Sequence, residues 1–145
     1  NVGNYSVDAA GGKSASTGYW AEDRRACEAR GVLWIPSLYP GLGWDNLMRQ
    51  APGTSTIPRR RGAFLWDQFY RLARMHGKSA YIAMFDEVDE GTAIFKGTSR
   101  PPTQAHFLGY EGLPSDWYLR LVGSGAKMLH GRLPVTPAIP FKPPD

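Results

Sequence analysis

A helix pattern at residues 62–76 runs almost directly into a strand pattern at residues 79–85. Apolar residues recur at helical spacing through the first segment, and Gly77 follows it as a natural stop. The recurring residues are Phe64, Leu65, Phe69, Leu72 and Ala73. The second segment holds Ala80-Tyr81-Ile82-Ala83-Met84, an apolar run of the length that buried strands have. A helix that leads into a buried strand is the repeating unit of parallel α/β proteins, so an α/β fold is expected.

The same alternation is predicted along the rest of the chain. Strand patterns occupy Asn1–Tyr5 and Val32–Tyr39, helix patterns occupy residues 19–30, 117–122 and 126–129, and loops are expected at residues 7–16 and 40–58. A loop as long as residues 40–58 inside a compact domain usually serves a function. The order strand–helix–strand–helix–strand–helix favours parallel βαβ units.

These units are too few for a self-sufficient barrel. Three strands cannot close on themselves, and an open three-stranded sheet leaves bare edges. We therefore expect the C-terminal βα units of a (β/α)8 barrel, incomplete in this chain, over residues 1–133. Bare edges also favour self-association. Five prolines within residues 134–145 predict an extended tail.

Composition narrows the classes of function. A chain of 145 residues with 42% hydrophobic residues suits one folded domain and excludes a disordered chain. The net charge of +4 is too mild for a dedicated nucleic-acid binder. The single cysteine, Cys27, excludes an intrachain disulfide and a cysteine-based zinc cluster. No apolar stretch is long enough to cross a membrane, so a membrane partner is not expected.

Four carboxylates crowd into five positions directly after the second predicted strand. They are Asp86, Glu87, Asp89 and Glu90. Crowded carboxylates repel one another, so folding alone gives little reason to place them there. Active sites of parallel α/β proteins lie at the carboxyl ends of strands, and paired carboxylates suit acid–base chemistry on glycosidic bonds. A solvated acidic loop without function and a divalent-cation site are the alternatives, although the Asp-x-Asp-x-Asp-Gly spacing of calcium loops is absent.

Several motifs occur together and in order along the chain. They are Val2-Gly3-Asn4-Tyr5, Tyr39-Pro40-Gly41-Leu42-Gly43-Trp44-Asp45-Asn46-Leu47, Ile57-Pro58-Arg59, Arg61-Gly62, Phe64-Leu65-Trp66-Asp67-Gln68, Ala83-Met84-Phe85-Asp86-Glu87-Val88-Asp89-Glu90-Gly91-Thr92 and Gly112-Leu113-Pro114-Ser115-Asp116. With these motifs the chain resembles the C-terminal part of the catalytic barrel in endo-α-mannosidase-type glycoside hydrolases, the family 71/99-like group.

This resemblance implies a (β/α)8 barrel that acts on α-linked glycans, needs no cofactor, and is secreted or periplasmic. The family's Asn-Glu-Trp-x-Glu-Gly-Thr motif falls on residues 86–92 and implies that Glu87 and Glu90 are catalytic. Glu87 would act as the base on the sugar's own 2-hydroxyl, which attacks the anomeric carbon, and Glu90 would protonate the leaving oxygen. Asp86 and Val88 replace the motif's Asn and Trp, which leaves the sugar and its linkage open.

The loop at residues 40–58 supplies candidate substrate contacts. Sugar rings stack on aromatic faces, so Tyr39 and Trp44 are candidates for such stacking. Asp45 and Asn46 either form hydrogen bonds with sugar hydroxyls or form a turn. Trp44 ends the Pro-Gly-x-x-Trp motif, Tyr39 precedes it, and Asp45 and Asn46 follow it.

Two charged residues complete the candidate site. Asp86 either orients a substrate hydroxyl or pairs with an arginine. Arg59 opens the run Arg59-Arg60-Arg61, and either lies in solvent, reaches an acidic sugar or pairs with the acidic segment. The prediction is therefore an O-glycosyl hydrolase with a glycan or polysaccharide as substrate. The alternative is a non-catalytic carbohydrate-binding or structural fragment of such a barrel.

Overall fold

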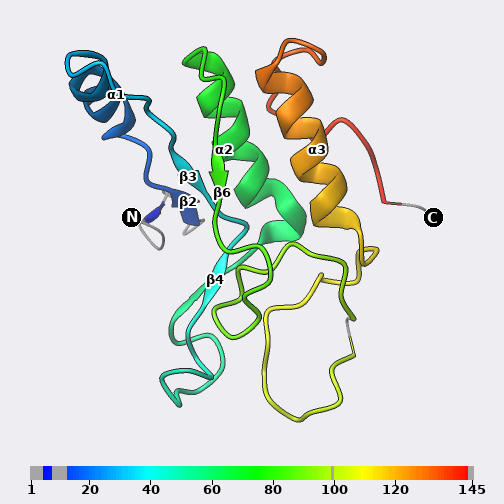
Figure 1. The fold of residues 1–145 in the computed structure, drawn as a ribbon. Coiled ribbons are helices and arrows are strands. Elements are labelled where there is room, and N and C mark those ends of the chain that lie inside the picture. Colours follow the sequence, from blue (N-terminus) through cyan, green and yellow to red (C-terminus); the bar gives the residue numbers. More distant parts are fainter. Residues whose placement is uncertain (1–4, 8–12, 99, 144–145) are drawn as a thin grey trace.

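The computed structural model describes residues 5–7, 13–98 and 100–143. In this part of the chain the helices are α1 (Trp20–Glu28), α2 (Ala63–Arg74) and α3 (Trp117–Leu129), with a short 3-10 helix η1 (Arg60–Gly62) before α2. Figure 1 shows α2 and α3 side by side. The predicted helices at residues 19–30 and 62–76 are confirmed. The two helical pieces predicted at residues 117–129 form one continuous helix.

One parallel βαβ unit lies at the centre of the fold. Strand β3 (Ser37–Leu38) pairs in parallel with β6 (Tyr81–Ile82), and α2 connects the two. The backbone ladder continues on both sides, because Tyr81 N donates to Pro36 O at 2.9 Å and Ala83 N donates to Leu38 O at 2.9 Å. The mixed α/β character and the parallel pairing predicted between these two segments are thus confirmed. The predicted buried strand at residues 79–85 is largely wrong, because only Tyr81 and Ile82 are strand residues, and Tyr81, Met84 and Phe85 are 56%, 38% and 55% exposed.

The predicted buried strand Val32–Tyr39 is largely wrong. Only Ser37 and Leu38 of this segment are strand residues, while Val32, Leu33 and Ile35 are 54%, 76% and 47% exposed. Pro36 has no N–H to donate, so only its carbonyl oxygen takes part in the ladder with β6.

Two further strand pairs lie mostly in segments that the sequence predicts as loops, although Tyr5 of the first pair ends the predicted strand Asn1–Tyr5. Strand β1 (Tyr5–Val7) pairs antiparallel with β2 (Lys13–Ala15), where a loop over residues 7–16 is expected. Strand β4 (Leu42–Gly43) pairs antiparallel with β5 (Thr56–Ile57), within the predicted loop at residues 40–58. Of the predicted strand Asn1–Tyr5, residues 1–4 lie outside the described residues.

The core is formed where α2 meets α3. The apolar face of α2 buries Leu65, Trp66, Phe69 and Leu72 there, and α3 contributes Trp117, Tyr118, Leu121, Met128 and Leu129. Phe64 of α2 lies in a second buried cluster with Ala15, Tyr39, Leu42 and Ile57. This packing is close, because a Cβ at Gly125 of α3 would lie 2.6 Å from ring atoms of Phe69. The predicted apolar face of residues 62–76 is therefore the face that is buried.

The chain after α3 packs back onto the helices. Residues 134–143 contain no helix or strand, but the ring of Phe141 lies 4.8 Å from that of Trp117, and Trp66 Nε1 donates to Thr136 O at 3.1 Å. The predicted tail is thus in contact with α2 and α3. In the part of the chain described here, none of the helices has the length and apolar character needed to cross a membrane.

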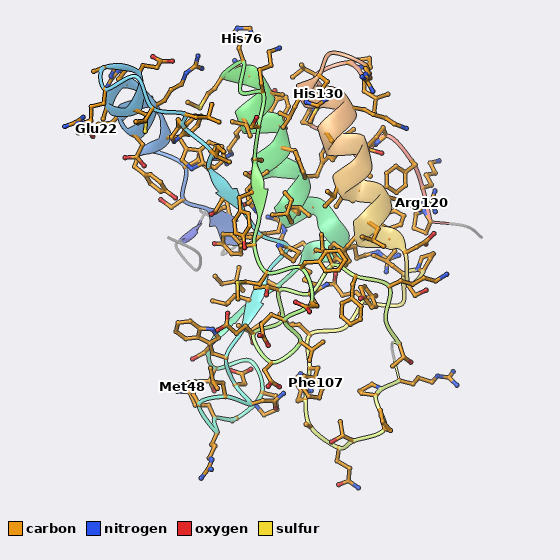
Figure 2. The ribbon with its side chains drawn as sticks, in the orientation of Figure 1. Glu22, Met48, His76, Phe107, Arg120 and His130 are labelled. Carbon is orange, nitrogen blue, oxygen red and sulfur yellow. The ribbon has the colours of Figure 1, made fainter. Side chains whose placement is uncertain are left out.

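The loops gather at one end of the molecule. Figure 1 shows residues 40–58, 84–98 and 100–112 at the end where β3 and β6 finish. Figure 2 places Met48 and Phe107 on these loops, away from His76 and His130 at the other end. Because active sites of parallel α/β proteins lie beyond the carboxyl ends of the strands, this end holds the candidate site.

Candidate functional site

The acidic segment is a closed turn that follows β6. The backbone oxygen of Glu87 accepts hydrogen bonds from the N–H groups of Thr92 and Ala93, at 3.1 and 2.9 Å. The Thr92 side chain is buried beneath the turn, and its hydroxyl lies 3.4 Å from the same oxygen. Within the turn, Glu87 Oε1 accepts from Asp89 N at 3.2 Å. Glu87 and Glu90 are half-buried, whereas the flanking carboxylates Asp86 and Asp89 are exposed.

Arg59 anchors the far side of this turn. Its side chain is 2% exposed, and Nη2 donates to Gly91 O at 2.8 Å and to Ala93 O at 2.6 Å. The Tyr118 and Tyr110 rings lie 4.6 and 5.6 Å from its guanidinium carbon. Burial lowers the pKa of Arg59 and raises the pKa of the Tyr118 hydroxyl, because burial disfavours the charged form of each group. Arg59 therefore meets the acidic segment at backbone oxygens and not at carboxylates.

A second contact joins the acidic turn to the loop at residues 40–58. Gly43 N donates to Glu90 O at 2.8 Å. Gly91 has a φ of +64°, and a Cβ there would lie 2.8 Å from Leu108 Cδ1 and 3.0 Å from Gly43 N. Glycine is thus required both for the backbone conformation and for the close approach of the two segments. Because Trp44 follows Gly43, this approach also places Trp44 close to the acidic turn. Trp44 is 41% exposed.

Asp45 organises the loop around it. Its side chain is 4% exposed and accepts from Ser55 N and Gly53 N, both at 2.6 Å, and from Thr56 Oγ1 at 2.9 Å. The hydrogen bond from Ser55, with those from Gly53 and Thr56, holds the pKa of Asp45 below its usual range. Asn46 Nδ2 donates to His106 O at 2.9 Å. Of the two roles that the sequence left open for Asp45 and Asn46, these contacts support the structural one.

Tyr39 lies in the core. It is 2% exposed, and its ring packs 5.1 Å from that of Phe64. The fully buried amide of Gln68 accepts from Tyr39 N at 3.2 Å and donates to Tyr39 O at 2.8 Å. The structure therefore places Glu87, Glu90 and Trp44 on two loops that are joined by the Gly43–Glu90 hydrogen bond, and it buries Tyr39 in the core.

Gln68 and Thr92 are supporting residues that the sequence reasoning did not single out. Gln68 is a polar residue on the apolar face of α2, four positions after Phe64. A polar residue at such a position indicates a buried side chain, so the sequence pattern alone could have identified Gln68. Thr92 ends the Glu-Gly-Thr motif. Among the described residues, no group of three or more His, Cys, Asp or Glu side chains is arranged to hold a metal ion.

Comparison with known proteins gives matches to a family model and to solved structures. The model described as glycosyl hydrolase family 99 matches residues 3–129. A structure of the GH99 endo-α-mannosidase from Bacteroides thetaiotaomicron, in complex with bis-tris propane, matches with a TM-score of 0.68 and 23% identity, over 79% of this chain and 35% of that one. A second structure of the GH99 endo-α-mannosidase from this organism matches with a TM-score of 0.66 and 25% identity, over 79% and 33%.

This chain thus spans about a third of the length of the solved structures it matches. A search of curated protein sequences found no match. The resemblance that the motifs indicate is confirmed by the family model, which covers most of the chain. On that ground, the chain belongs to glycosyl hydrolase family 99.

Proposed function

We propose that this chain carries the catalytic carboxylate pair of a glycoside hydrolase, and that Glu87 and Glu90 form the pair. The observation that carries the proposal is the construction of the acidic turn. Two half-buried carboxylates lie on a short segment at the end of a parallel strand, and buried groups, Arg59 and Thr92, hold its backbone. Such preorganisation suits groups that must meet a substrate in fixed positions.

The two glutamates divide the acid–base work between them. Glu90 protonates the glycosidic oxygen as its bond to the anomeric carbon breaks. Glu87 removes the proton of the sugar's 2-hydroxyl, and the 2-oxygen forms a new bond to the anomeric carbon in the same step. Water then opens the resulting ring at the anomeric carbon, with the two carboxyl groups returning to their starting protonation.

The substrate class is an α-linked glycan. Support comes from the family and from the surface beside the turn, where Trp44 offers an exposed ring and Asp86 an exposed carboxylate. Aromatic rings bind the C–H faces of sugars, and carboxylates accept hydrogen bonds from their hydroxyls. Tyr39, Asp45, Asn46 and Arg59 then support these groups from within.

We also infer that residues 1–133 form part of a (β/α)8 barrel, with residues 134–145 as a tail. The parallel pair β3–β6 supports this, as does the match to a third of each longer family structure. Exposed apolar side chains support it further, because Leu33 is 76%, Tyr81 56% and Phe85 55% exposed along the two strand segments. Neighbouring barrel strands would cover such residues.

The test is glycan hydrolysis by this chain, and by a longer natural protein where one contains it, on α-mannan and other polysaccharides. Glu87→Gln and Glu90→Gln should each lower turnover by at least about 100-fold, the usual contribution of a positioned acid or base. Asp89→Asn is the matched control, since it also removes one charge from the turn but leaves the pair intact. Turnover that falls equally in all three variants, or in none, would contradict the assignment.

A further inference from the structure

Arg59 lies at the start of a strained turn. In this arginine turn, residues 59–62, Arg60 and Arg61 have φ values of +53° and +54°. Residues with a side chain rarely adopt this left-handed conformation, because the Cβ comes too close to the backbone. Two of them in succession persist only where the surrounding structure holds them. The groups that hold the arginine turn thus also determine where Arg59 lies.

Glu111 is the residue that holds the arginine turn. Its carboxylate oxygen Oε2 accepts from Arg61 N at 2.5 Å, and its backbone oxygen accepts from Arg61 Nη1 at 2.8 Å. A third hydrogen bond, from Trp117 Nε1 to Arg61 O at 3.1 Å, stabilises the same residue. Glu111 itself has a φ of +53° and is followed by Gly112 at +76°. Two turns with left-handed residues therefore fix each other, although they lie 50 positions apart in the sequence.

Tyr118 links the carboxylate of Glu111 to Arg59. The Tyr118 hydroxyl donates to Glu111 Oε2 at 3.5 Å, and its ring lies 4.6 Å from the guanidinium carbon of Arg59. Burial raises the pKa of this hydroxyl, the charge of Arg59 lowers that pKa, and the charge of Glu111 raises it. Both charged residues therefore act on one buried hydroxyl, and Glu111 is coupled to Arg59 by side chains as well as through the arginine turn.

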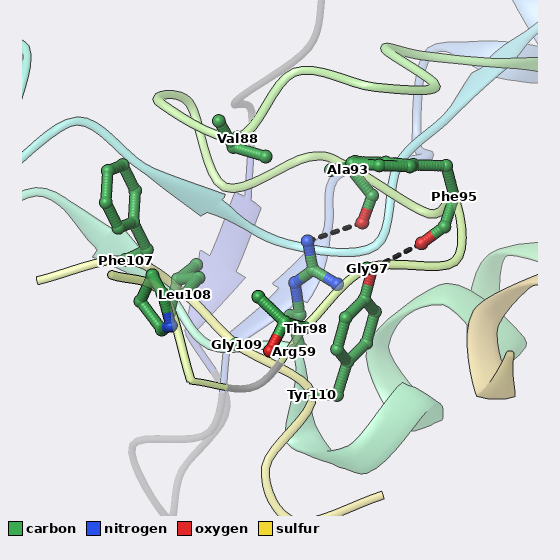
Figure 3. Close-up of a pocket in the computed structure, with 11 residues that line it drawn as sticks. Arg59, Val88, Ala93, Phe95, Gly97, Thr98, Phe107, Leu108, Gly109 and Tyr110 are labelled. Atoms are coloured by element: carbon green, nitrogen blue, oxygen red, sulfur yellow. Dashed lines mark hydrogen bonds between the residues drawn. The ribbon is translucent and has the colours of Figure 1, made fainter. Parts of the chain in front are cut away.

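Arg59 connects this arrangement to the acidic turn. Its Nη2 donates to Ala93 O at 2.6 Å, as Figure 3 shows. The N–H groups of Thr92 and Ala93 donate to Glu87 O and so close the acidic turn. A displacement of Arg59 would therefore move the backbone that carries Glu87 and Glu90.

We propose that Glu111 is a positioning residue: it holds the arginine turn, and through Arg59 it sets the position of the acidic turn. This inference rests on the proposed function, because Glu87 and Glu90 are the groups that it positions. The role requires an acceptor oxygen, which takes hydrogen bonds from Arg61 N and the Tyr118 hydroxyl. Glutamine offers such an oxygen at the same reach and alanine does not. Glu111→Gln should therefore keep the role, and Glu111→Ala should lose it.

NMR of the amide groups tests the positioning without turnover. In Glu111→Ala, the amide signals of Thr92 and Ala93 should shift, although both groups donate to Glu87 O and not to Glu111. A loss of stability alone would leave the signals of the folded chain in place. Glu111→Gln should keep both signals close to their original positions. Glu22→Ala is the matched control, because it also removes an exposed glutamate, from α1, and it should shift neither signal.

Kinetic measurements test the consequence for catalysis. With a glycan that the unmodified protein hydrolyses, Glu111→Ala should lower kcat by at least about tenfold, because a misplacement of about 1 Å can lower a rate by up to about 100-fold. KM should change by less than about threefold, since Glu111 positions the reacting groups and not the bound sugar. Glu111→Gln should retain kcat within about threefold. Glu111 is exposed, so both variants should fold, as circular dichroism would verify.

Four results would overturn the inference. They are unmoved amide signals in Glu111→Ala, equal shifts in Glu22→Ala, a Glu111→Gln variant as impaired as Glu111→Ala, and a Glu111→Ala variant that does not fold. The proposed function fails separately. Shifted signals without hydrolysis of any glycan would refute the hydrolase proposal alone. Hydrolysis that depends on Glu87 and Glu90 but is unchanged in Glu111→Ala would refute the positioning role alone.

Discussion

Two glycines of α3 should respond in opposite ways to alanine. Gly123 is exposed and a Cβ there meets nothing within 4 Å, whereas a Cβ at Gly125 would lie 2.6 Å from three ring atoms of Phe69. Both positions are helical, so both substitutions gain the same helix propensity, about 1 kcal/mol. Only Gly125→Ala also meets a steric conflict, and the difference between the variants therefore isolates the packing of α2 on α3.

The steric cost follows from the distances. Carbon atoms pack best at about 3.5–4.0 Å, so the Phe69 ring would have to retreat by about 1 Å. Phe69 is 2% exposed, and the centroid of its ring lies 6.4 Å from that of Trp66, so the ring has little room to move. Overpacking of this kind costs about 1–3 kcal/mol. Gly123→Ala should thus raise the free energy of unfolding by up to about 1 kcal/mol. The free energy of unfolding of Gly125→Ala should be about 1–3 kcal/mol lower than that of Gly123→Ala.

Urea and thermal unfolding would measure both variants beside the unmodified chain. For a domain of this size, 1 kcal/mol corresponds to about 2–4 °C in Tm. A Gly125→Ala variant as stable as Gly123→Ala would refute the reasoning, because it would mean that α2 and α3 are not in the close contact that holds the core together.

Three other predictions concern the loops and the exposed apolar surface. Asp45 should stabilise its loop fully at pH values above about 3.9, the pKa of this carboxyl in the unfolded chain. The loop should open more often as the pH falls through the lower pKa that Asp45 has in the folded protein. Amide hydrogen exchange of the loop should therefore speed up in acid, and Asp45→Asn should abolish that pH dependence. Trp44→Ala should weaken glycan binding by up to about tenfold in calorimetry, while Leu47→Ala, which removes another exposed side chain from the same loop, should not; equal losses would contradict a stacking role. Leu33→Lys should reduce self-association in sedimentation experiments, whereas Leu119→Lys on α3 should leave it unchanged; a purely monomeric parent chain would contradict this prediction.

The helices and the parallel pairing were predictable from local patterns. The apolar spacing of residues 64–73 and the stop at Gly77 predict α2 closely, because helix hydrogen bonds join residues four apart and depend little on distant segments. The strands were harder to predict. The segment at residues 32–36 is apolar, yet a strand needs a partner from elsewhere in the chain, and Pro36 removes one donor.

The candidate site was likewise predictable from the sequence only in part. The Glu-x-x-Glu-Gly-Thr motif identifies the acidic turn directly from the sequence. The roles of Asp45 and Arg59 could not be predicted, because most of their hydrogen-bond partners are backbone groups, up to 34 positions away, and backbone groups carry no sequence signal. A charged residue in a motif is equally compatible with substrate contact and with support of a loop, and only the three-dimensional contacts separate the two.

The most direct test of the account compares cleavage and binding of one α-mannan oligosaccharide by the unmodified protein and by its Glu87→Gln variant. If the acidic turn is catalytic, cleavage should fall by at least about 100-fold while the dissociation constant changes by less than about threefold, because the substitution removes a reacting group and little binding surface. Undiminished cleavage in the variant would contradict the assignment of Glu87. Tight binding without cleavage by the unmodified protein would instead identify a carbohydrate-binding member of the family that does not hydrolyse its ligand.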